Sequence, residues 1–380
     1  MSKKNILFIE ESLDPTTGGV QRVTWAISNF LKKHGYNVFF LYCRIDYSII
    51  EANDKLKLDF WTNDLDFFSQ SLDHFIIQNN ISIVIDQDYH TSAIQKALKE
   101  QIAKHKINLI YCYHRNPYFI DFISGSNPFF SIIKSWIKRF LGRTYRPEFA
   151  MMCEISDKYV LLSKSYINQF YRRFLVDKTK LTYILNPKPF NDIIPEKSIL
   201  KKEKIVFIVT RFEERIKNIK GALDIWKEVE KKGNRGWKLI IGGYGPDELE
   251  IRRYAIDLGL EFCEIIGKID NPSDYYKKAS IYMMTSKCEG YPMTLIEAMH
   301  YGCIPIAFDY FSSVHDIIEN GINGIIVKKR KPNSYVKKLF SIMNDTEKRN
   351  TLSLNAMNST KKNDINVIGK DWISLIESFH

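Results

Sequence analysis

The chain has few of the residues that hold disulfide-rich or metal-binding proteins together. Its 380 residues include six cysteines, none of which forms a Cys-x-x-Cys pair. Most of them lie in apolar runs, which favours buried thiols over disulfides or a zinc site. Glycine and proline are also scarce, at 18 and 12 residues, so collagen-like and low-complexity chains are excluded. With 45% hydrophobic residues the sequence is typical of a globular protein, and its length suggests two domains.

Long hydrophobic runs are absent as well. No apolar stretch has the length needed to cross a bilayer. The first apolar stretch, residues 5–9, is followed at once by Glu10 and Glu11, so it is too short for a secretory signal and is typical of a first strand. We expect a cytoplasmic protein, either free or bound peripherally to the inner face of the plasma membrane.

Acidic residues are outnumbered, and the formal net charge of +11 indicates anionic partners. Nucleic acid, acidic lipid and the phosphates of a sugar nucleotide all fit that charge. The segment 131–146 has five basic residues, no acidic residue, and apolar and aromatic residues between them. At helical spacing it predicts either a helix that docks on an anionic membrane or an ordinary helix with solvated charges. Its candidate acceptor or membrane contacts are Lys134, Trp136, Lys138, Arg139 and Arg143.

Short apolar strands alternate with amphipathic helices along the whole chain. This alternation predicts parallel sheets with helices on both faces, in two doubly wound α/β domains that bind ligands beyond the carboxyl ends of their strands. Pro187 and Pro189 interrupt the pattern and mark the linker. Two such domains would face each other across a cleft. The twelve predicted strands are 5–9, 37–42, 81–85, 108–113, 158–162, 182–185, 205–210, 238–242, 263–266, 281–284, 304–308 and 324–327.

The most informative motif is the run 288–299, Cys-Glu-Gly-Tyr-Pro-Met-Thr-Leu-Ile-Glu-Ala-Met. Pro292 suits the first helical position, and the N–H groups of the next three residues then point out of the helix end, where phosphate oxygens bind. Glu297 lies one turn inside and could reach ribose hydroxyls, while Glu289, before the turn, could reach a group on the far phosphate. Taken alone, the two carboxylates would be better explained as solvated charges on a helix surface. Together with the helix end they predict a sugar-nucleotide site.

The order of motifs resembles family 4 of the retaining, nucleotide-sugar-dependent glycosyltransferases, which have the GT-B fold. The Glu-x7-Glu run with its Gly-aromatic-Pro turn carries the resemblance, with strand 280–286 before it, strand 302–307 after it and the glycine-containing hairpin 320–327. The resemblance implies an acceptor-binding Rossmann-like domain in residues 1–188, to which a final helix in residues 363–380 crosses back. It also implies a nucleotide-sugar-binding domain in residues 189–362.

The resemblance assigns roles to residues elsewhere in the chain. Arg211 and Lys217 follow strand 205–210, and a guanidinium with an ammonium suits the two phosphates of a nucleoside diphosphate. His114 ends strand 108–113, where the family uses a histidine to contact the transferred sugar; a packed, hydrogen-bonded histidine is the alternative. With Glu289 these three form the expected catalytic set. Gly19 belongs to a glycine loop expected to close over the donor.

The remaining donor contacts are expected around turns of the second domain. Gly243 lies in the Gly-Gly-Tyr-Gly-Pro turn at 242–246, which is either a donor contact or a tight structural turn. Ile269 follows strand 263–266, where the family stacks the base. The donor contacts in the motif itself are Tyr291, Pro292, Met293, Thr294 and Glu297.

The resemblance implies transfer of a hexose from a UDP- or GDP-sugar to a hydroxyl of a glycan or lipid-linked acceptor, with retention. UDP is favoured, because the Glu-Gly-Tyr-Pro-Met run and Asn186-Pro187 most resemble the branch of the family that builds bacterial surface polysaccharides. No Asp-x-Asp motif lies near the phosphate-binding elements, because Asp86-Gln87-Asp88 follows a strand of the first domain. We therefore expect no metal and no other cofactor, and no nucleic acid partner. A nucleotide-sugar epimerase on the same scaffold and a non-catalytic protein that binds polyanions or membranes are the alternatives.

Overall fold

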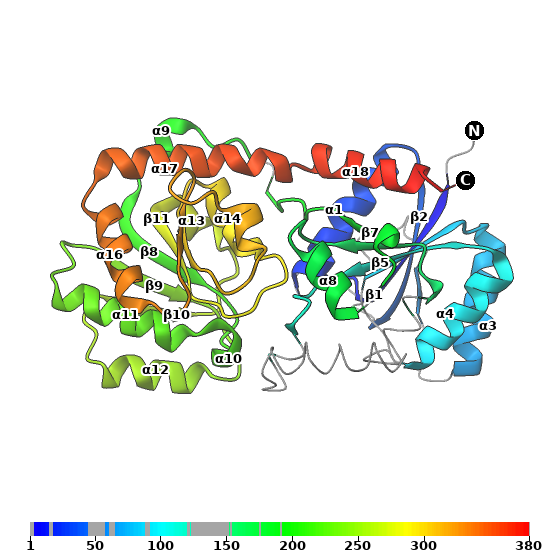
Figure 1. The fold of residues 1–380 in the computed structure, drawn as a ribbon, viewed down its shortest axis with the longest axis horizontal. Coiled ribbons are helices and arrows are strands. Elements are labelled where there is room, and N and C mark those ends of the chain that lie inside the picture. Colours follow the sequence, from blue (N-terminus) through cyan, green and yellow to red (C-terminus); the bar gives the residue numbers. More distant parts are fainter. Residues whose placement is uncertain are drawn as a thin grey trace. The chain divides into compact units, whose positions relative to one another are not determined.

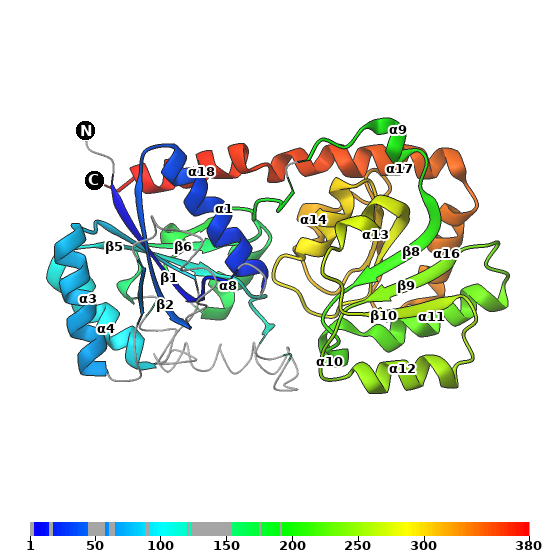
Figure 2. The same ribbon diagram turned by 180° about the vertical axis from the view of Figure 1, so that it is seen from behind.

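A computed structural model of the protein describes residues 4–14, 18–44, 58–60, 65–87, 92–119, 122, 152, 154–174, 176–190 and 192–379. Contacts divide the chain into two compact units. The first unit comprises Met1–Pro189 with Ile365–His380, and the second comprises Phe190–Asp364. Figures 1 and 2 show the two units from opposite sides, the first drawn from blue to green with its C-terminal helix in red.

The first unit is built on a seven-stranded sheet in the order β3-β2-β1-β4-β5-β6-β7, in which every neighbouring pair is parallel. The strand order reverses between β1 and β4, which is the switch point of a doubly wound sheet. The strands are β1 (Asn5–Ser12), β2 (Asn37–Arg44), β3 (Leu58–Phe60), β4 (Ile83–Asp86), β5 (Asn108–Tyr113), β6 (Lys158–Leu161) and β7 (Leu181–Tyr183).

Helices cover both faces of this sheet, which is why its strands read as continuous apolar runs rather than alternating ones. One face packs against α3 (Leu65–Asn79), α4 (Ser92–His105) and α8 (Tyr166–Phe174). The other packs against α1 (Gly19–Lys33) and α18 (Ile365–Glu377). In α18, Ile368, Trp372 and Ile376 recur every four residues and are buried in that core. The predicted return of the last helix to the first domain is confirmed.

The second unit has a six-stranded parallel sheet in the order β10-β9-β8-β11-β12-β13, and its strand order reverses between β8 and β11. The strands are β8 (Glu203–Val209), β9 (Lys238–Gly242), β10 (Cys263–Gly267), β11 (Ala279–Met284), β12 (Ile304–Phe308) and β13 (Ile325–Val327). All twelve predicted strands are therefore present, and the two-domain α/β fold class is confirmed. The short strand β3 was missed, because three residues are too few to show a period.

Helices again lie on both faces of the second sheet. The helices of the second unit are α9 (Glu196–Ile199), α10 (Glu214–Lys217), α11 (Ile219–Lys231), α12 (Glu248–Asp257), α13 (Ser273–Lys278), α14 (Met293–His300), α15 (Val314–Ile317), α16 (Pro332–Met343) and α17 (Thr346–Ser359). The core on one face joins strand residues to α11 and α16. Near the other face, Phe207 of β8 packs against Tyr276 of α13 and Tyr282 of β11. No helix in the described part of the chain is long and apolar enough to cross a membrane.

Candidate functional site

The candidate site of the second unit lies at the carboxyl ends of β8 and β11, the two strands that flank the switch point. The segment after β8 carries Arg211 and leads into α10, whose last residue is Lys217. The segment after β11 carries Glu289 and leads into α14. Ligands of doubly wound sheets bind at this position, because the segments after the two strands diverge to opposite faces and leave room between them.

Three hydrogen bonds hold the end of α10 against the segment that follows β11. The hydroxyl of Thr285 donates to the carbonyl of Lys217 at 3.1 Å, and the Asn218 amide donates to the carbonyl of Thr285 at 3.3 Å. The N–H of Lys287 donates to the carbonyl of Ile216 at 2.7 Å. Asn218 has φ of 53°, a left-handed conformation that asparagine tolerates better than most residues. The two segments thus form one rigid unit.

Lys217 and Glu289, both predicted from sequence as catalytic residues, form an ion pair. The ammonium nitrogen lies 2.7 Å from the carboxylate oxygen Oε1, and the two side chains are 19% and 14% exposed. Because both groups are largely shielded, their attraction is screened less than that of a surface pair. Burial and the neighbouring Glu289 carboxylate raise the pKa of Cys288 to about 12, so that thiol stays protonated and is not a nucleophile here.

Arg211 differs from Lys217 in having an exposed side chain. Among the residues that the structure describes, its guanidinium has no hydrogen-bond or ion-pair partner. Of the two predicted cations, Lys217 is thus paired with Glu289 and Arg211 is exposed.

Helix α14 begins one residue later than the sequence predicted. Pro292 is the residue before the helix rather than its first residue, and its carbonyl accepts the N–H of Leu295 at 3.0 Å. The prediction of three outward N–H groups is therefore wrong for Leu295. In the described part of the chain, the N–H groups of Met293 and Thr294 have no partner, and these two donors with the helix dipole remain for an anion.

Glu297 is 2% exposed, and its carboxylate oxygen Oε2 accepts a hydrogen bond of 3.1 Å from the hydroxyl of Tyr276. Burial, reinforced by the charge of Glu297, raises the pKa of Tyr276 well above its ordinary value, so the hydroxyl remains a donor. Sequence reasoning missed Tyr276. No spacing rule joins it to Glu297, because the contact depends on how α13 and α14 pack.

The side chain of Tyr291, predicted as a donor contact, is held by the fold. It is 6% exposed, and its hydroxyl accepts a hydrogen bond of 3.0 Å from the Asn363 amide. The aromatic residue of the Gly-aromatic-Pro turn fastens that turn to the end of the second unit.

Gly243 has a structural role that the sequence offered as an alternative to donor binding. Its φ is +142°, its N–H donates to the carbonyl of Gly267 at 2.7 Å, and a Cβ there would lie 1.8 Å from the carbonyl oxygen of Thr210. Any side chain would therefore force these turns apart. Ile269 is partly buried and lies against Gly242, where a Cβ would come within 2.0 Å of its terminal methyl.

In the first unit, the carboxyl edge of the sheet carries the other predicted residues. Gly19 is the first residue of α1, after the extended residue Gly18. His114 follows β5, and its ring nitrogen Nε2 lies 2.5 Å from the side-chain oxygen Oε1 of Gln87, which follows β4. Burial, with a smaller effect of the charge on Arg115, lowers the pKa of His114 to about 4. The imidazole is therefore neutral near pH 7.

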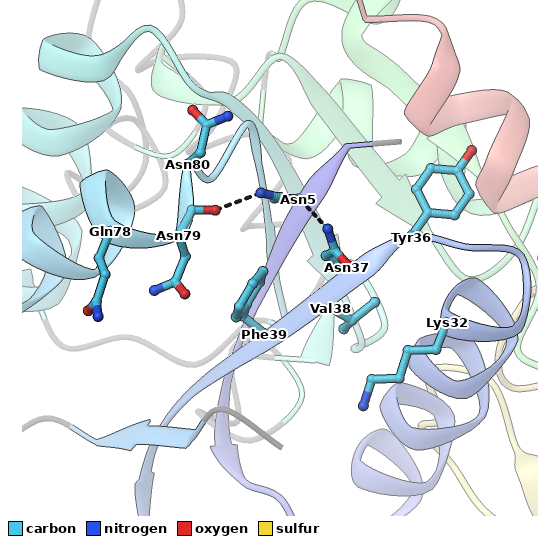
Figure 3. A pocket seen from close by; sticks show the side chains of 9 residues that line it. All are labelled: Asn5, Lys32, Tyr36, Asn37, Val38, Phe39, Gln78, Asn79 and Asn80. Carbon is cyan, nitrogen blue, oxygen red and sulfur yellow. Dashed lines mark hydrogen bonds between the residues drawn. The ribbon is translucent and has the colours of Figure 1, made fainter. Parts of the chain in front are cut away.

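A separate pocket of about 540 Å³ lies at the opposite, amino-terminal edge of the first sheet (Figure 3). Its amides bind one another: Asn37 donates to Asn5 at 2.8 Å, and Asn5 donates to the carbonyl of Asn79 at 2.6 Å. It holds none of the predicted site residues. It is lined by Asn5, Lys32, Tyr36, Asn37, Val38, Phe39, Gln78, Asn79 and Asn80.

Two further predictions concern the basic segment and metal. The basic segment 131–146, with Lys134, Trp136, Lys138, Arg139 and Arg143, lies outside the described residues. Within the described ranges, no group of three or more His, Cys, Asp or Glu side chains is arranged to hold a metal ion. Asp86 is buried at the end of β4.

The fold and the switch-point site define a GT-B protein, and comparison with known proteins agrees. Anabaena HepE in complex with UDP-glucose has the same fold, with a TM-score of 0.75 at 15% identity over 99% of this chain and 100% of that one. Residues 190–359 match the family model for glycosyl transferases group 1. The second unit of this chain is therefore a glycosyl transferases group 1 domain.

Two curated relatives extend beyond that domain. One is the GalNAc-α-(1→4)-GalNAc-α-(1→3)-diNAcBac-PP-undecaprenol α-1,4-N-acetyl-D-galactosaminyltransferase of Campylobacter jejuni, 30% identical over 244 residues. That match spans 64% of this chain and 64% of the relative, somewhat less than two thirds of either. The other is an uncharacterized glycosyltransferase of Haemophilus influenzae, 23% identical over 87% of this chain and 88% of the relative.

Proposed function

We propose that this protein is a retaining glycosyltransferase of cell-surface polysaccharide synthesis. It moves a hexose from a nucleoside-diphosphate sugar, with UDP as the favoured nucleotide, to a hydroxyl of a glycan or lipid-linked acceptor. The second unit binds the donor and the first binds the acceptor.

One observation carries the proposal: the Lys217–Glu289 ion pair at the switch point, beside the free end of α14. The leaving group of the reaction is a diphosphate, whose negative charge grows as the sugar departs. Lys217 and Arg211 follow β8, and the N–H groups of Met293 and Thr294 begin the helix after β11, the neighbouring strand at the switch point. Fixed donors of this kind stabilise developing charge without reorganising at the moment of reaction.

The two carboxylates contact different parts of the donor. Glu289 lies on the far side of the turn from α14 and orients the sugar. Glu297 lies one turn inside the helix, with Tyr276 fixing one of its oxygens, and accepts from the ribose hydroxyls. His114 contacts the transferred sugar from the first unit. No second carboxylate is assigned as a base, and an oxygen of the donor phosphate takes the acceptor proton, on the same face as the departing diphosphate.

The comparisons support the choice of donor and acceptor class. A solved neighbour binds UDP-glucose, and a relative is named for transfer to an undecaprenol-linked glycan. An acceptor of that kind lies at a membrane surface, where the basic segment 131–146 would dock. The enzyme would then work peripherally, with the lipid rather than the protein anchored in the bilayer.

The first experiment is a thermal-shift screen of UDP- and GDP-sugars, because a ligand that binds only the folded state raises its apparent stability. The stabilising donor is then incubated with a lipid-linked acceptor, and the anomeric configuration of the product is read by NMR. An α-linked product from an α-linked donor supports retention. Turnover of the donor without any acceptor would favour an epimerase. Absence of nucleotide affinity would favour a non-catalytic polyanion binder.

A further inference from the structure

Gln87 and His114 lie on the same face of the first sheet, at the carboxyl ends of the neighbouring strands β4 and β5. Ile83 and Ile85 of β4, and Ile110 and Cys112 of β5, belong to the core that packs against α1 and α18. Side chains two residues apart share a face. Gln87 and His114 each continue that alternation one step past the strand, so both extend the face of the sheet that α1 covers.

Their contact leaves two buried polar atoms without partners. The imidazole Nε2 lies 2.5 Å from the Gln87 oxygen Oε1. In the described part of the chain, neither His114 Nδ1 nor Gln87 Nε2 has a hydrogen-bond partner, although both atoms are shielded from solvent. A carbonyl oxygen only accepts, so Nε2 must carry the hydrogen and Nδ1 is a bare acceptor. Two buried groups without partners are costly unless a ligand satisfies them.

The surroundings keep the ring neutral. Burial lowers the pKa of His114 to about 4, and the charge of Arg115 acts in the same direction. Other charged groups at this edge of the sheet include Glu10 of β1, Asp14 after that strand, Asp86 next to Gln87, and Arg22 in the first turn of α1. A neutral imidazole with so low a pKa is a poor proton acceptor in a reaction, but a competent acceptor of a hydrogen bond.

We propose that Gln87 is a positioning residue that fixes the tautomer of His114, so that bare Nδ1 accepts a hydrogen bond from one hydroxyl of the bound sugar. The amide Nε2 of Gln87 donates to a neighbouring hydroxyl of the same ring. The pair thus matches two adjacent hydroxyls, one donating and one accepting. The identity of the ligand in this inference rests on the proposed function. The tautomer of His114 rests only on its contact with Gln87.

The first test is made without substrate. In protein carrying ¹⁵N-labelled histidine, the ring nitrogen shifts of His114 should report hydrogen on Nε2 and none on Nδ1 from pH 5 to pH 8. Hydrogen on Nδ1, or an imidazolium at pH 7, would overturn the proposal. This readout needs no turnover, so it tests the positioning role separately from the proposed function. If the protein binds no sugar nucleotide but His114 has the expected tautomer, the proposed function is contradicted and the positioning role stands.

The second test uses two substitutions of Gln87. Gln87→Leu removes the acceptor for His114 Nε2 and the donor to the sugar. We therefore expect mixed tautomers of His114, and a transfer rate lowered about tenfold, as for one lost hydrogen bond to the sugar. Gln87→Glu keeps an acceptor at Nε2 but adds a negative charge that raises the pKa of His114. Activity of this variant should be lost as the pH falls through the raised pKa, because a protonated ring cannot accept a hydrogen bond. The loss should occur at a higher pH than in the unsubstituted enzyme. At pH 8 the tautomer of His114 should be unchanged.

Gln101 provides the matched control. It is also a buried glutamine of the first unit, but it donates to Ser69 at 3.0 Å, between α4 and α3 on the opposite face of the sheet. Gln101→Glu should lower stability without moving the pH profile or the His114 shifts. A Gln87→Leu enzyme with unchanged tautomer and rate, or equal pH profiles for the two Gln→Glu variants, would overturn the positioning role.

Discussion

The ammonium of Lys217 lies 2.7 Å from the carboxylate of Glu289, although the two residues are 72 positions apart in the chain. The proposed diphosphate cation is thus paired with the proposed sugar-binding carboxylate. In the proposed reaction, a diphosphate would compete with Glu289 for Lys217. Part of the binding free energy of the donor would then redirect Glu289 toward the sugar, which would couple the two roles.

Replacing Lys217 by Ala should weaken UDP binding and slow transfer. One charge-assisted hydrogen bond is lost, at a cost of about 1.5–3 kcal/mol, and the negative charge of Glu289 loses its Lys217 partner. Arg211→Ala should weaken binding as well, without disturbing an existing ion pair. Calorimetric titration with UDP measures both effects.

Lys220→Ala is the matched control for these variants. Lys220 lies only three residues beyond Lys217 in the sequence. It forms an ion pair with Glu250 on the surface between α11 and α12. UDP affinity should be unchanged in this control, and melting temperatures should show that all three proteins are folded. If both the Lys217 and Arg211 variants bind UDP as tightly as the unsubstituted protein, these two residues do not bind the diphosphate.

The two carboxylates should separate in binding and rate measurements. Glu289→Gln should not weaken UDP binding, because it releases Lys217 and removes a negative charge, but it should lower turnover by removing a contact with the sugar. Glu297→Gln should weaken UDP binding about tenfold, since a carboxylate that accepts from ribose is replaced by a neutral amide. The opposite pattern in paired affinity and rate data would mean that the two roles are reversed.

Gly243→Ala should destabilise the second unit strongly. The new Cβ would lie 1.8 Å from the Thr210 carbonyl oxygen at a φ of +142°, so we expect a loss on the order of 2 kcal/mol or more in the free energy of unfolding. Gly233→Ala is the control, because its φ is +82° and nothing lies within 4 Å. It should cost only the backbone strain, about 1–2 kcal/mol. If denaturant unfolding shows the same loss of unfolding free energy in both variants, the clash at Gly243 is not the cause.

Transfer should persist in excess EDTA. In the proposed reaction, the charge of the leaving diphosphate would be met by Lys217, Arg211 and the end of α14 without a divalent ion. The measurement is the transfer rate with and without the chelator, followed by addition of manganese or magnesium. Loss of activity that either ion restores would refute the metal-free reaction and direct attention to Asp86 and Asp88.

The basic segment 131–146 should bind anionic membranes. Each cation near such a surface contributes on the order of 1 kcal/mol, and salt should weaken the attraction. Co-sedimentation with anionic and neutral liposomes, at low and high salt, measures it. A variant with Lys134, Lys138, Arg139 and Arg143 changed to Ser should lose liposome binding and keep its UDP affinity. Indifference of the unsubstituted protein to anionic liposomes at low salt would point to a soluble acceptor.

The order of elements was determined by the sequence itself. Runs of Val, Ile and Leu in parallel strands are buried on both faces, so they stand out between amphipathic helices without knowledge of the fold. The sequence also placed His114 after a strand of the first sheet, and Arg211 and Glu289 in segments that follow strands of the second sheet. Parallel strands bring their carboxyl ends to one edge of each sheet. Local rules of this kind predicted the two doubly wound domains, whereas the roles of most candidate residues came from the resemblance to a known family.

Tertiary structure decided which partners hold those residues in the fold. Tyr291 and Gly243 were predicted as donor contacts, yet Asn363 binds the hydroxyl of one and the Thr210 carbonyl packs against the other. The partners of Glu297 and His114, which are Tyr276 and Gln87, come from other elements of the chain. Such contacts depend on how helices and strands pack against each other, and no periodicity within a single element encodes a distance between two of them.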